Sequence, residues 1–337
     1  MARPRLVIQP ISSIPDPDLR NCPNDMTAPR VLISGSMAYD TIMVFDGHFK
    51  DHILPDRVHM LNVSFLAPRL KREFGGCAAN IAYTLNGLGG SACVLAAVGS
   101  DGADYVKRLS AMGIDTSLIL QCGDHYTAQA FITTDLSDNQ ISAFHPGAMG
   151  RAHEVAAPSA GVWGIVAPNG KDAMLRHAQE FSASGIPWIF DPGQALPMFS
   201  GDELQVLLGQ AHALTVNDYE SKLLSENTGL SETEIAAKVA TQVVTMGGEG
   251  CLIRQGGKAE RIAAATIAHA ADPTGCGDAF RGGLLYALSH DLGWQTAVRL
   301  GSVMGAIKIE HDGPQNHPVT REEAARRYQA NYGAAPW

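Results

Sequence analysis

The stretch AANIAYTLNGLGGSACVLAAV, residues 78–98, decides the fold because its hydrophobic period changes along its length. Over residues 78–88, apolar side chains recur at three- and four-residue spacings, which predicts a helix packed against a sheet. Residues 94–98 form a short apolar run, which predicts a return to a strand. Because residues 31–33 form an earlier predicted strand, the unit is strand, helix, strand, and the fold class is α/β.

The rest of the chain repeats this alternation, with two interruptions. Further strands are predicted at residues 164–167, 188–190, 213–216 and 242–246, with helices between them. Residues 125–145 instead predict a β-hairpin with a polar turn, and residues 42–66 look strand-rich without a helical period. Together these two segments predict a small extra sheet, which is either a lid over a cleft or an edge extension.

Length and composition indicate a globular protein that binds a small molecule. A chain of 337 residues with 45% hydrophobic and 18% charged residues can bury one large core with a smaller appendage. Its 34 acidic residues exceed its 25 basic ones, which gives a net charge of −9, and there is no Lys/Arg-rich block. These features argue against a nucleic-acid partner. An anionic substrate would need backbone amides, a metal ion or a few basic side chains.

The N-terminal segment and the cysteines bear on the compartment. Residues 1–29 are rich in proline, which predicts a mobile leader, with Met26 as an alternative to Met1 as the start of translation. The apolar run at residues 6–8 is too short for a signal peptide, and no stretch approaches a membrane span of about 20 residues. The six cysteines lie far apart without a C-x-x-C pair, so we expect reduced thiols, a cytoplasmic protein and no membrane partner.

The sequence DPTGCGDAF, residues 272–280, carries the strongest chemical signal. Apolar residues recur every four positions from Phe280 to Leu288, so a helix should begin near Gly277 with free amides in its first turn. Glycines at positions 275 and 277 let the backbone approach a phosphate closely, and the helix dipole favours negative charge there. This stretch therefore predicts an anion-binding site.

Asp278 within this stretch has two interpretations. A carboxylate beside a phosphate site repels the ligand unless it takes part in the chemistry, so Asp278 could accept the proton of an attacking hydroxyl as a general base. Alternatively, Asp278 only caps the helix. The flanking Asp-Pro-Thr-Gly favours the catalytic interpretation.

Residues 272–278, together with GGCAAN at residues 75–80, resemble the paired signatures of the ribokinase-like (PfkB) family of carbohydrate and nucleoside kinases. The resemblance runs from about residue 31 to about residue 320. Five stretches look like the bacterial adenosine or nucleoside kinases of that family: residues 73–77, 191–194, 216–220, 277–281 and 313–316.

This resemblance implies a ribokinase-like fold, with a three-layer α/β/α core and a small β-sheet lid. One kinase domain would span residues 30–330, with lid segments inserted at about 42–66 and 125–145. Residues 331–337 would form a C-terminal tail.

Matched residue by residue, the resemblance assigns roles in phosphoryl transfer. Asp278 is the implied base, and the amides of Gly275, Cys276 and Gly277 form the implied anion hole. Asp40 would accept hydrogen bonds from the ribose hydroxyls. For Asn80, an amide on a helix surface is the alternative to a place in the acceptor pocket. The other residues expected at that pocket are Gly75 and Gly76, with Phe131 and Gln194 as candidates for purine recognition.

The implied nucleotide site lies further along the chain. Asn217 and Glu220 occupy an N-x-x-E position, where Glu220 would hold Mg²⁺ through water. Thr245, Gly247 and Gly250 would lie under the phosphates and ribose of ATP, although this glycine cluster alone is more typical of a tight turn. It is not a Walker A sequence, because no Gly-Lys-Ser/Thr follows.

The resemblance also implies a site for a monovalent cation. Asp272, Thr274 and the loop around Gly313 correspond to it, so stimulation by K⁺ is an expectation. Arg281 departs from the small or apolar residue of many sugar kinases, and it either contacts phosphate or forms a salt bridge on its helix.

The function implied is transfer of the γ-phosphoryl group of ATP to the 5′-hydroxyl of adenosine, giving AMP and ADP. A broader nucleoside kinase would use the same ribose contacts, and a kinase of ribose or a fructose derivative is the next alternative. A non-catalytic nucleoside or ATP sensor is less favoured, because the base and the anion-hole glycines are present. No G-x-G-x-x-G follows the first strand, which argues against a dehydrogenase. A monomer and a homodimer are both compatible with the sequence.

Overall fold

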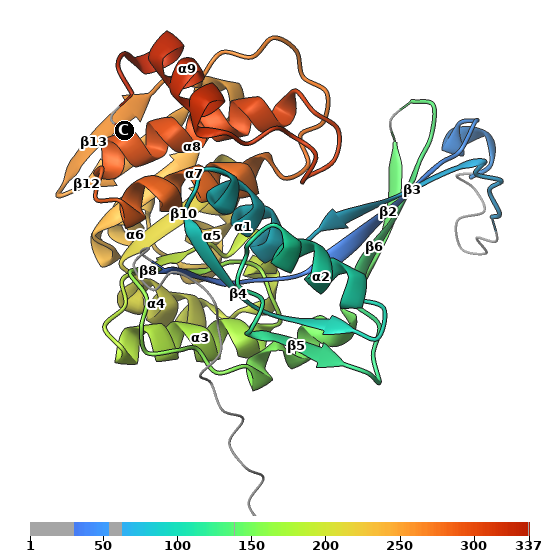
Figure 1. Cartoon of the computed structure of the whole chain (residues 1–337), viewed down its shortest axis with the longest axis horizontal. Helices are drawn as coiled ribbons and strands as arrows, with labels where there is room; N and C mark the ends of the chain where they lie inside the picture. The colour runs from blue at the N-terminus through green and yellow to red at the C-terminus, as the bar shows by residue number, and fades with distance from the viewer. Residues whose placement is uncertain (1–29, 54–62, 138, 336) are drawn as a thin grey trace, which may run out of the picture.

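The computed structural model describes residues 30–53, 63–137, 139–335 and 337, so the predictions for the leader and for Met26 lie outside the described residues. Two sheets organise this part of the chain (Figure 1). The larger sheet has the strand order β13-β12-β11-β10-β9-β8-β1-β4-β5. Pairing is parallel from β11 to β5, whereas β12 pairs antiparallel with both β11 and β13. A mainly parallel sheet with crossover helices confirms the predicted α/β class.

The elements of the larger sheet and its helices follow the predicted alternation. The strands are β1 (Arg30–Ser34), β4 (Ser91–Gly99), β5 (Ile119–Cys122), β8 (Trp163–Val166), β9 (Trp188–Phe190), β10 (Ala213–Asn217), β11 (Thr241–Thr245), β12 (Cys251–Gln255) and β13 (Lys258–Ile262). The α-helices are α1 (Cys77–Gly87), α2 (Ala103–Ala111), α3 (Lys171–Ala183), α4 (Gly201–Gln210), α5 (Asp218–Thr228), α6 (Glu232–Lys238), α7 (Cys276–Ser289), α8 (Trp294–Ile309) and α9 (Arg321–Tyr332).

Alternate residues of the central strands face two separate layers of helices. On β1, Val31 and Ile33 pack into a core with apolar residues of α1, α7 and α8. Leu32 lies between them in sequence and points to the opposite face, into a core with residues of α3, α4 and α5. The larger sheet is therefore the middle of a three-layer α/β/α arrangement.

The smaller sheet has the order β3-β2-β6-β7 and stands to one side of the three layers (Figure 1). Its strands are β2 (Ala38–Val44), β3 (Arg69–Gly75), β6 (Ala128–Thr134) and β7 (Gln140–His145). β6 and β7 form the antiparallel hairpin predicted within residues 125–145. β2 follows β1 after three residues, so the chain passes directly from the larger sheet into the smaller one.

The other predicted lid segment, residues 42–66, overlaps the strands of the smaller sheet only at its start, and its residues 54–62 lie outside the described residues. β2 ends at Val44 and β3 begins at Arg69. Between them, the described residues contain only a 3-10 turn, Phe49–Asp51. The prediction did not include β3, because this strand reads RLKREFG and is mostly exposed, so it lacks the apolar pattern by which a buried strand is recognised.

The C-terminal segment packs against the core rather than extending from it. α9 continues to Tyr332, and the ring of Trp337 lies 5.4 Å from that of Tyr328, which is buried. Among the residues that the structure describes, no helix combines the length and the apolar character needed to cross a membrane.

Candidate active site

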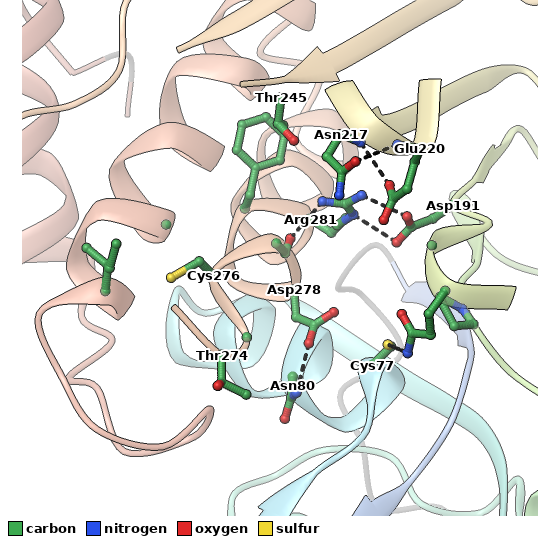
Figure 2. A pocket seen from close by; sticks show the side chains of 18 of the residues that line it. Cys77, Asn80, Asp191, Asn217, Glu220, Thr245, Thr274, Cys276, Asp278 and Arg281 are labelled. Atoms are coloured by element: carbon green, nitrogen blue, oxygen red, sulfur yellow. Dashed lines mark hydrogen bonds and ion pairs between the residues drawn. The ribbon is translucent and has the colours of Figure 1, made fainter. Parts of the chain in front are cut away.

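A cavity of about 1050 Å³ lies between the two sheets, at the carboxyl ends of the parallel strands. Its walls come from the segments after β1, β8 and β9, from the ends of β10 and β11, from the first turn of α7 and from the smaller sheet. Figure 2 shows side chains from several of these elements pointing into one space. A pocket for a single drug-sized ligand has about 300–1,000 Å³, so this cavity has room for two substrates.

Asp278 lies in the first turn of α7 and faces the cavity (Figure 2). Its Oδ2 accepts a hydrogen bond of 2.8 Å from Nδ2 of Asn80. Burial raises the pKa of Asp278 to about 6, against the opposing effects of Asn80 and of Arg281. A carboxylate with a pKa near neutrality is suited to accept a proton from a hydroxyl. Helix capping does not account for this side chain, because its hydrogen bond goes to α1 and not to an amide of α7.

A buried chain of hydrogen bonds holds the Asn80 amide. Gln315 Nε2 donates to Asn80 Oδ1 at 2.9 Å and to the hydroxyl of Tyr105 at 2.5 Å. That hydroxyl donates to the carbonyl of Gly75 at 2.7 Å. Because its oxygen is engaged in this way, Asn80 presents its NH₂ group to Asp278. Of the two alternatives for Asn80, a place in the pocket agrees with the structure. Gln315 and Tyr105 were not expected here, although the GPQN run of residues 313–316 contains Gln315.

The predicted anion hole lines the cavity beside Asp278. Gly275 caps α7 with φ 80°, and an added Cβ would lie 2.8 Å from Cβ of Pro314, so glycine is required there. The amide of Cys276 was expected to be free for an anion, but it donates to the carbonyl of Pro273 at 3.2 Å. In the described structure, the amides of Gly275 and Gly277 have no backbone acceptor and are available to a phosphate.

Arg281 forms a buried ion pair across the cavity wall (Figure 2). Its Nε and Nη2 each donate to one carboxylate oxygen of Asp191 at 2.8 Å, and Nη1 donates to the carbonyl of Gly277 at 3.2 Å. The sequence left phosphate contact and a salt bridge within the helix as alternatives. The salt bridge is present, but its acidic partner lies outside α7, because Asp191 follows β9.

Asp40 projects from β2 and also lines the cavity. Burial, and then the charge of Asp272, raise the pKa of its carboxyl group. In the part of the chain that the structure describes, no donor is hydrogen-bonded to this carboxylate, so its acceptors are open to the cavity. Gly75 on β3 makes room for it, because an added Cβ would lie 2.5 Å from Oδ2 of Asp40. Gly76, with φ 89°, begins α1 against the backbone of residues 36–38.

One row of paired residues crosses the cavity face of the smaller sheet. Asp40 pairs with Ala130, and Ala130 pairs with Phe144. All three line the cavity. Phe131, which we expected to contact a purine, does not line it, because neighbouring residues on a strand point to opposite faces. Phe144 is an aromatic residue on the face of the smaller sheet that lines the cavity.

Gln194 lies at the cavity as predicted. It follows β9 in the 3-10 turn Gly193–Met198, and its Nε2 is 3.8 Å from Sγ of Cys77 at the start of α1. Its amide is exposed and therefore accessible to a ligand.

Asn217 and Glu220, which were expected at the nucleotide site, form a capping box at the start of α5. Asn217 Oδ1 accepts from the amide of Glu220 at 2.7 Å, and Glu220 Oε2 accepts from the amide of Asn217 at 2.8 Å. Both residues also line the cavity, as do Thr245, Gly247 and Gly250. Gly250 has φ 90°, and an added Cβ would lie 2.1 Å from the carbonyl of Ile262. The glycines therefore form a tight turn that is also a wall of the cavity.

The residues present suit Mg²⁺ held through water. Burial and the nearby Asp191 raise the pKa of Glu220, as expected for a carboxylate near a second acidic group. Among the described residues, no group of three His, Cys, Asp or Glu side chains forms a metal site. Glu220 would thus act with water and phosphate oxygens, which is how Mg²⁺ is commonly bound.

The residues expected to bind K⁺ lie close together, and the oxygens of Asp272 already accept hydrogen bonds. Asp272 Oδ1 accepts from the amide of Thr274 and Oδ2 from the amide of Gly313, both at 2.8 Å. The carbonyl of Asp272 accepts from the ammonium of Lys308 at 2.8 Å. Lys308 was not expected here, although a single lysine in the apolar C-terminal half of α8 was a visible signal.

Comparisons with known proteins agree with this geometry. The model of the pfkB family carbohydrate kinases matches residues 32–321. A nucleoside kinase of Methanothermobacter thermautotrophicus is 31% identical over 89% of this chain and 99% of its own length. The structure of Burkholderia thailandensis nucleoside kinase in complex with inosine is 46% identical, covers 91% of this chain and 99% of its own, and superposes with a TM-score of 0.82.

A ribokinase of Thermotoga maritima, at 23% identity, shares the fold with a TM-score of 0.77 over 89% of this chain and 99% of its own. The predicted ribokinase-like architecture, a three-layer core with a small second sheet, is thereby confirmed. The two nucleoside kinases described above show that the chain is an ATP-dependent phosphotransferase that acts on an alcohol group of a nucleoside or sugar. The chain belongs to the pfkB family of carbohydrate kinases.

Proposed function

We propose that this enzyme is a purine nucleoside kinase that transfers the γ-phosphoryl group of ATP to the ribose 5′-hydroxyl, with adenosine and inosine as acceptors. The observation that carries the proposal is that Asp278 shares one cavity with two different binding groups. One is the pair of free backbone amides in the α7 turn, and the other is the open carboxylate of Asp40. The amides suit an anion and the carboxylate suits a polyol.

The reaction follows from these positions. The 5′-oxygen attacks the γ-phosphorus, its proton passes to the Asp278 carboxylate, and the bond from phosphorus to the bridging oxygen breaks to release ADP. The amides of Gly275 and Gly277 would stabilise charge on the transferring group. Mg²⁺ supplies charge neutralisation on the phosphates when it is bound, with Glu220 as its water-mediated partner. Asn80 keeps the Asp278 carboxylate oriented through their hydrogen bond.

The range of acceptors rests on the acceptor end of the cavity. Phe144 lies in the same row as Asp40, which suits a base that stacks on the ring while its ribose contacts the carboxylate. Gln194 adds an amide that can donate to or accept from a base edge. The Burkholderia relative in complex with inosine, and in complex with ADP-inosine, supports purine nucleosides other than adenosine as acceptors.

A panel of acceptors tests this proposal directly. Adenosine, inosine, guanosine, cytidine, ribose and fructose would each be incubated with Mg·ATP, with ADP release measured and the products identified by mass spectrometry. We expect 5′-monophosphates from the purine nucleosides with the highest kcat/KM. Efficient phosphorylation of ribose or fructose with weak activity on nucleosides would replace the proposal by a sugar kinase. Nucleoside binding without ADP release would point to a sensor.

Replacing the proposed ribose contact should weaken acceptor binding. Asp40→Ala removes a carboxylate that would accept ribose hydroxyls, and a hydrogen bond to a charged group contributes about 1.5–3 kcal/mol. We therefore expect the Kd of the nucleoside to rise about 10- to 100-fold in calorimetry, with the Kd of ATP unchanged. Asp46→Ala is the matched control, because Asp46 follows the same strand and pairs with exposed Arg69. Equal affinities in both variants would exclude Asp40 as the ribose contact.

A further inference from the structure

Lys308 is a fully buried lysine close to the phosphate end of the cavity. It lies in the last turn of α8, and its side chain is 0% exposed. Its Nζ donates to the carbonyls of Asp272 at 2.8 Å and of His311 at 2.9 Å, and lies 3.8 Å from Oδ2 of Asp272. Burying an ammonium costs free energy unless acceptors replace its water, so these oxygens form a site built for one positive charge.

This ammonium joins the two loops that shape the anion hole. One loop runs from Asp272 into Gly275, and the other follows α8 through His311 to Gly313. The carboxylate of Asp272 reinforces the connection, because it accepts from the amides of both Thr274 and Gly313. The second loop also carries Pro314, which packs against Gly275. One cation thus fixes the backbone whose amides face the phosphate.

The oxygen atoms around the Lys308 ammonium are of the kind that bind a monovalent cation. Backbone carbonyl oxygens replace the hydration shell of K⁺ in proteins, and here two carbonyls and a nearby carboxylate surround the ammonium. The positive charge of Lys308 also acts on Cys276 at the start of α7. Burial raises the pKa of the Cys276 thiol to about 11, and the charge of Lys308 opposes that shift. The lysine therefore already uses the carbonyl oxygens of Asp272 and of His311, at the place where K⁺ was expected, so an additional ion would compete with its ammonium for them.

We propose that the Lys308 ammonium serves as a built-in monovalent cation that positions the anion hole, so that phosphoryl transfer by this enzyme does not require K⁺. The inference rests on the kinase activity but not on the identity of the acceptor. It makes Lys308 a positioning residue, since it acts through the loop of residues 272–275.

The first test uses the unchanged enzyme. Turnover would be measured with Mg·ATP and the best acceptor in K⁺-free tetramethylammonium chloride, and again with KCl at equal ionic strength. We expect the two rates to agree within about twofold. Stimulation by K⁺ of about tenfold or more would overturn the proposal whatever the variants do, because it would require a separate ion site.

Two variants distinguish a cation site from a general structural role. Lys308→Ala removes the ammonium and leaves space for an ion, whereas Lys308→Met removes it and fills the space. Displacement of catalytic groups by about 1 Å costs up to about 10²-fold, so we expect both to lose about 10- to 100-fold in kcat without K⁺. KCl or methylammonium chloride should restore Lys308→Ala by at least about tenfold and leave Lys308→Met unchanged. A folded Lys308→Ala that neither ion restores would contradict the proposal.

A thermal readout separates this inference from the proposed function. In scanning fluorimetry, K⁺ should raise the Tm of Lys308→Ala relative to tetramethylammonium, and should not raise that of the unchanged enzyme or of Lys308→Met. Arg254→Met is the control, because it removes a cation paired with Glu232 at the far edge of the sheet. This shift is expected even if the acceptor panel finds no active nucleoside. A K⁺-induced shift that is the same in all four proteins would count against the cation site.

Discussion

The Asp278→Asn variant is expected to lose about 10²- to 10⁴-fold in kcat while it binds both substrates with nearly unchanged affinity, since a positioned general base contributes that much. Asparagine has the same shape, and its amide oxygen can still accept the 2.8 Å hydrogen bond from Asn80. It cannot take the proton of an attacking hydroxyl. Calorimetry with nucleoside and ATP would establish that binding is retained. Turnover within about threefold of the unchanged enzyme would remove Asp278 from the mechanism.

The pH dependence of this variant supplies a second readout. The pKa of Asp278 is raised by burial to about 6, so in the unchanged enzyme kcat should fall as the pH drops through about 6 and the base becomes protonated. An aspartate in the unfolded chain has a pKa of about 3.9, so the folded state binds this proton more tightly. The ionised side chain therefore lowers stability above pH 6, and at pH 8 the Tm of Asp278→Asn should equal or exceed that of the unchanged enzyme.

Asp104→Asn is the matched control for a helix effect. Asp104 also lies in the first turn of a helix, α2, but outside the cavity. Its replacement removes a favourable interaction with the helix dipole, which contributes about 0.3–1 kcal/mol, and should not change kcat. If Asp104→Asn and Asp278→Asn behaved alike in both assays, Asp278 would be a helix-terminal charge and not a base.

Arg281→Met is expected to lower the free energy of unfolding by about 3–5 kcal/mol, because it leaves Asp191 charged and buried without its partner. The two side chains are 7% and 4% exposed, and both hydrogen bonds between them measure 2.8 Å. Methionine fills a similar volume, so a cavity contributes little to the loss. Urea denaturation followed by tryptophan fluorescence would measure it.

The double variant Asp191→Asn/Arg281→Met shows whether the uncompensated charge is the cause. We expect it to regain most of the lost stability, because replacing both partners removes the buried charge. Arg326→Met is the control for a surface pair, since Arg326 is 65% exposed beside Glu323, and its loss should stay below about 1 kcal/mol. A loss of the same small size in Arg281→Met would mean that Asp191 finds water or another donor.

Local patterns determined much of this protein. The change of hydrophobic period across residues 78–98 placed α1 and β4 correctly, because apolar spacing along a short segment reflects which face is buried. The glycines of residues 272–280 indicated an anion-binding turn, since positive φ at Gly275 and the free amides of a helix start are local properties. The family resemblance rested on residues 272–278 and 75–80, and it assigned roles to Asp278 and Asp40, which line one cavity.

Only the tertiary structure decided which side chains complete the site. Asn80 and Asp278 are 198 residues apart, Asp191 and Arg281 are 90 apart, and the Lys308 ammonium meets a carbonyl 36 residues away. Strand register decided that Phe144, and not Phe131, lines the cavity, because a shift of one residue reverses the face. Such contacts depend on how the layers and sheets pack together, and the hydrophobic spacing of any single segment carries no information about them.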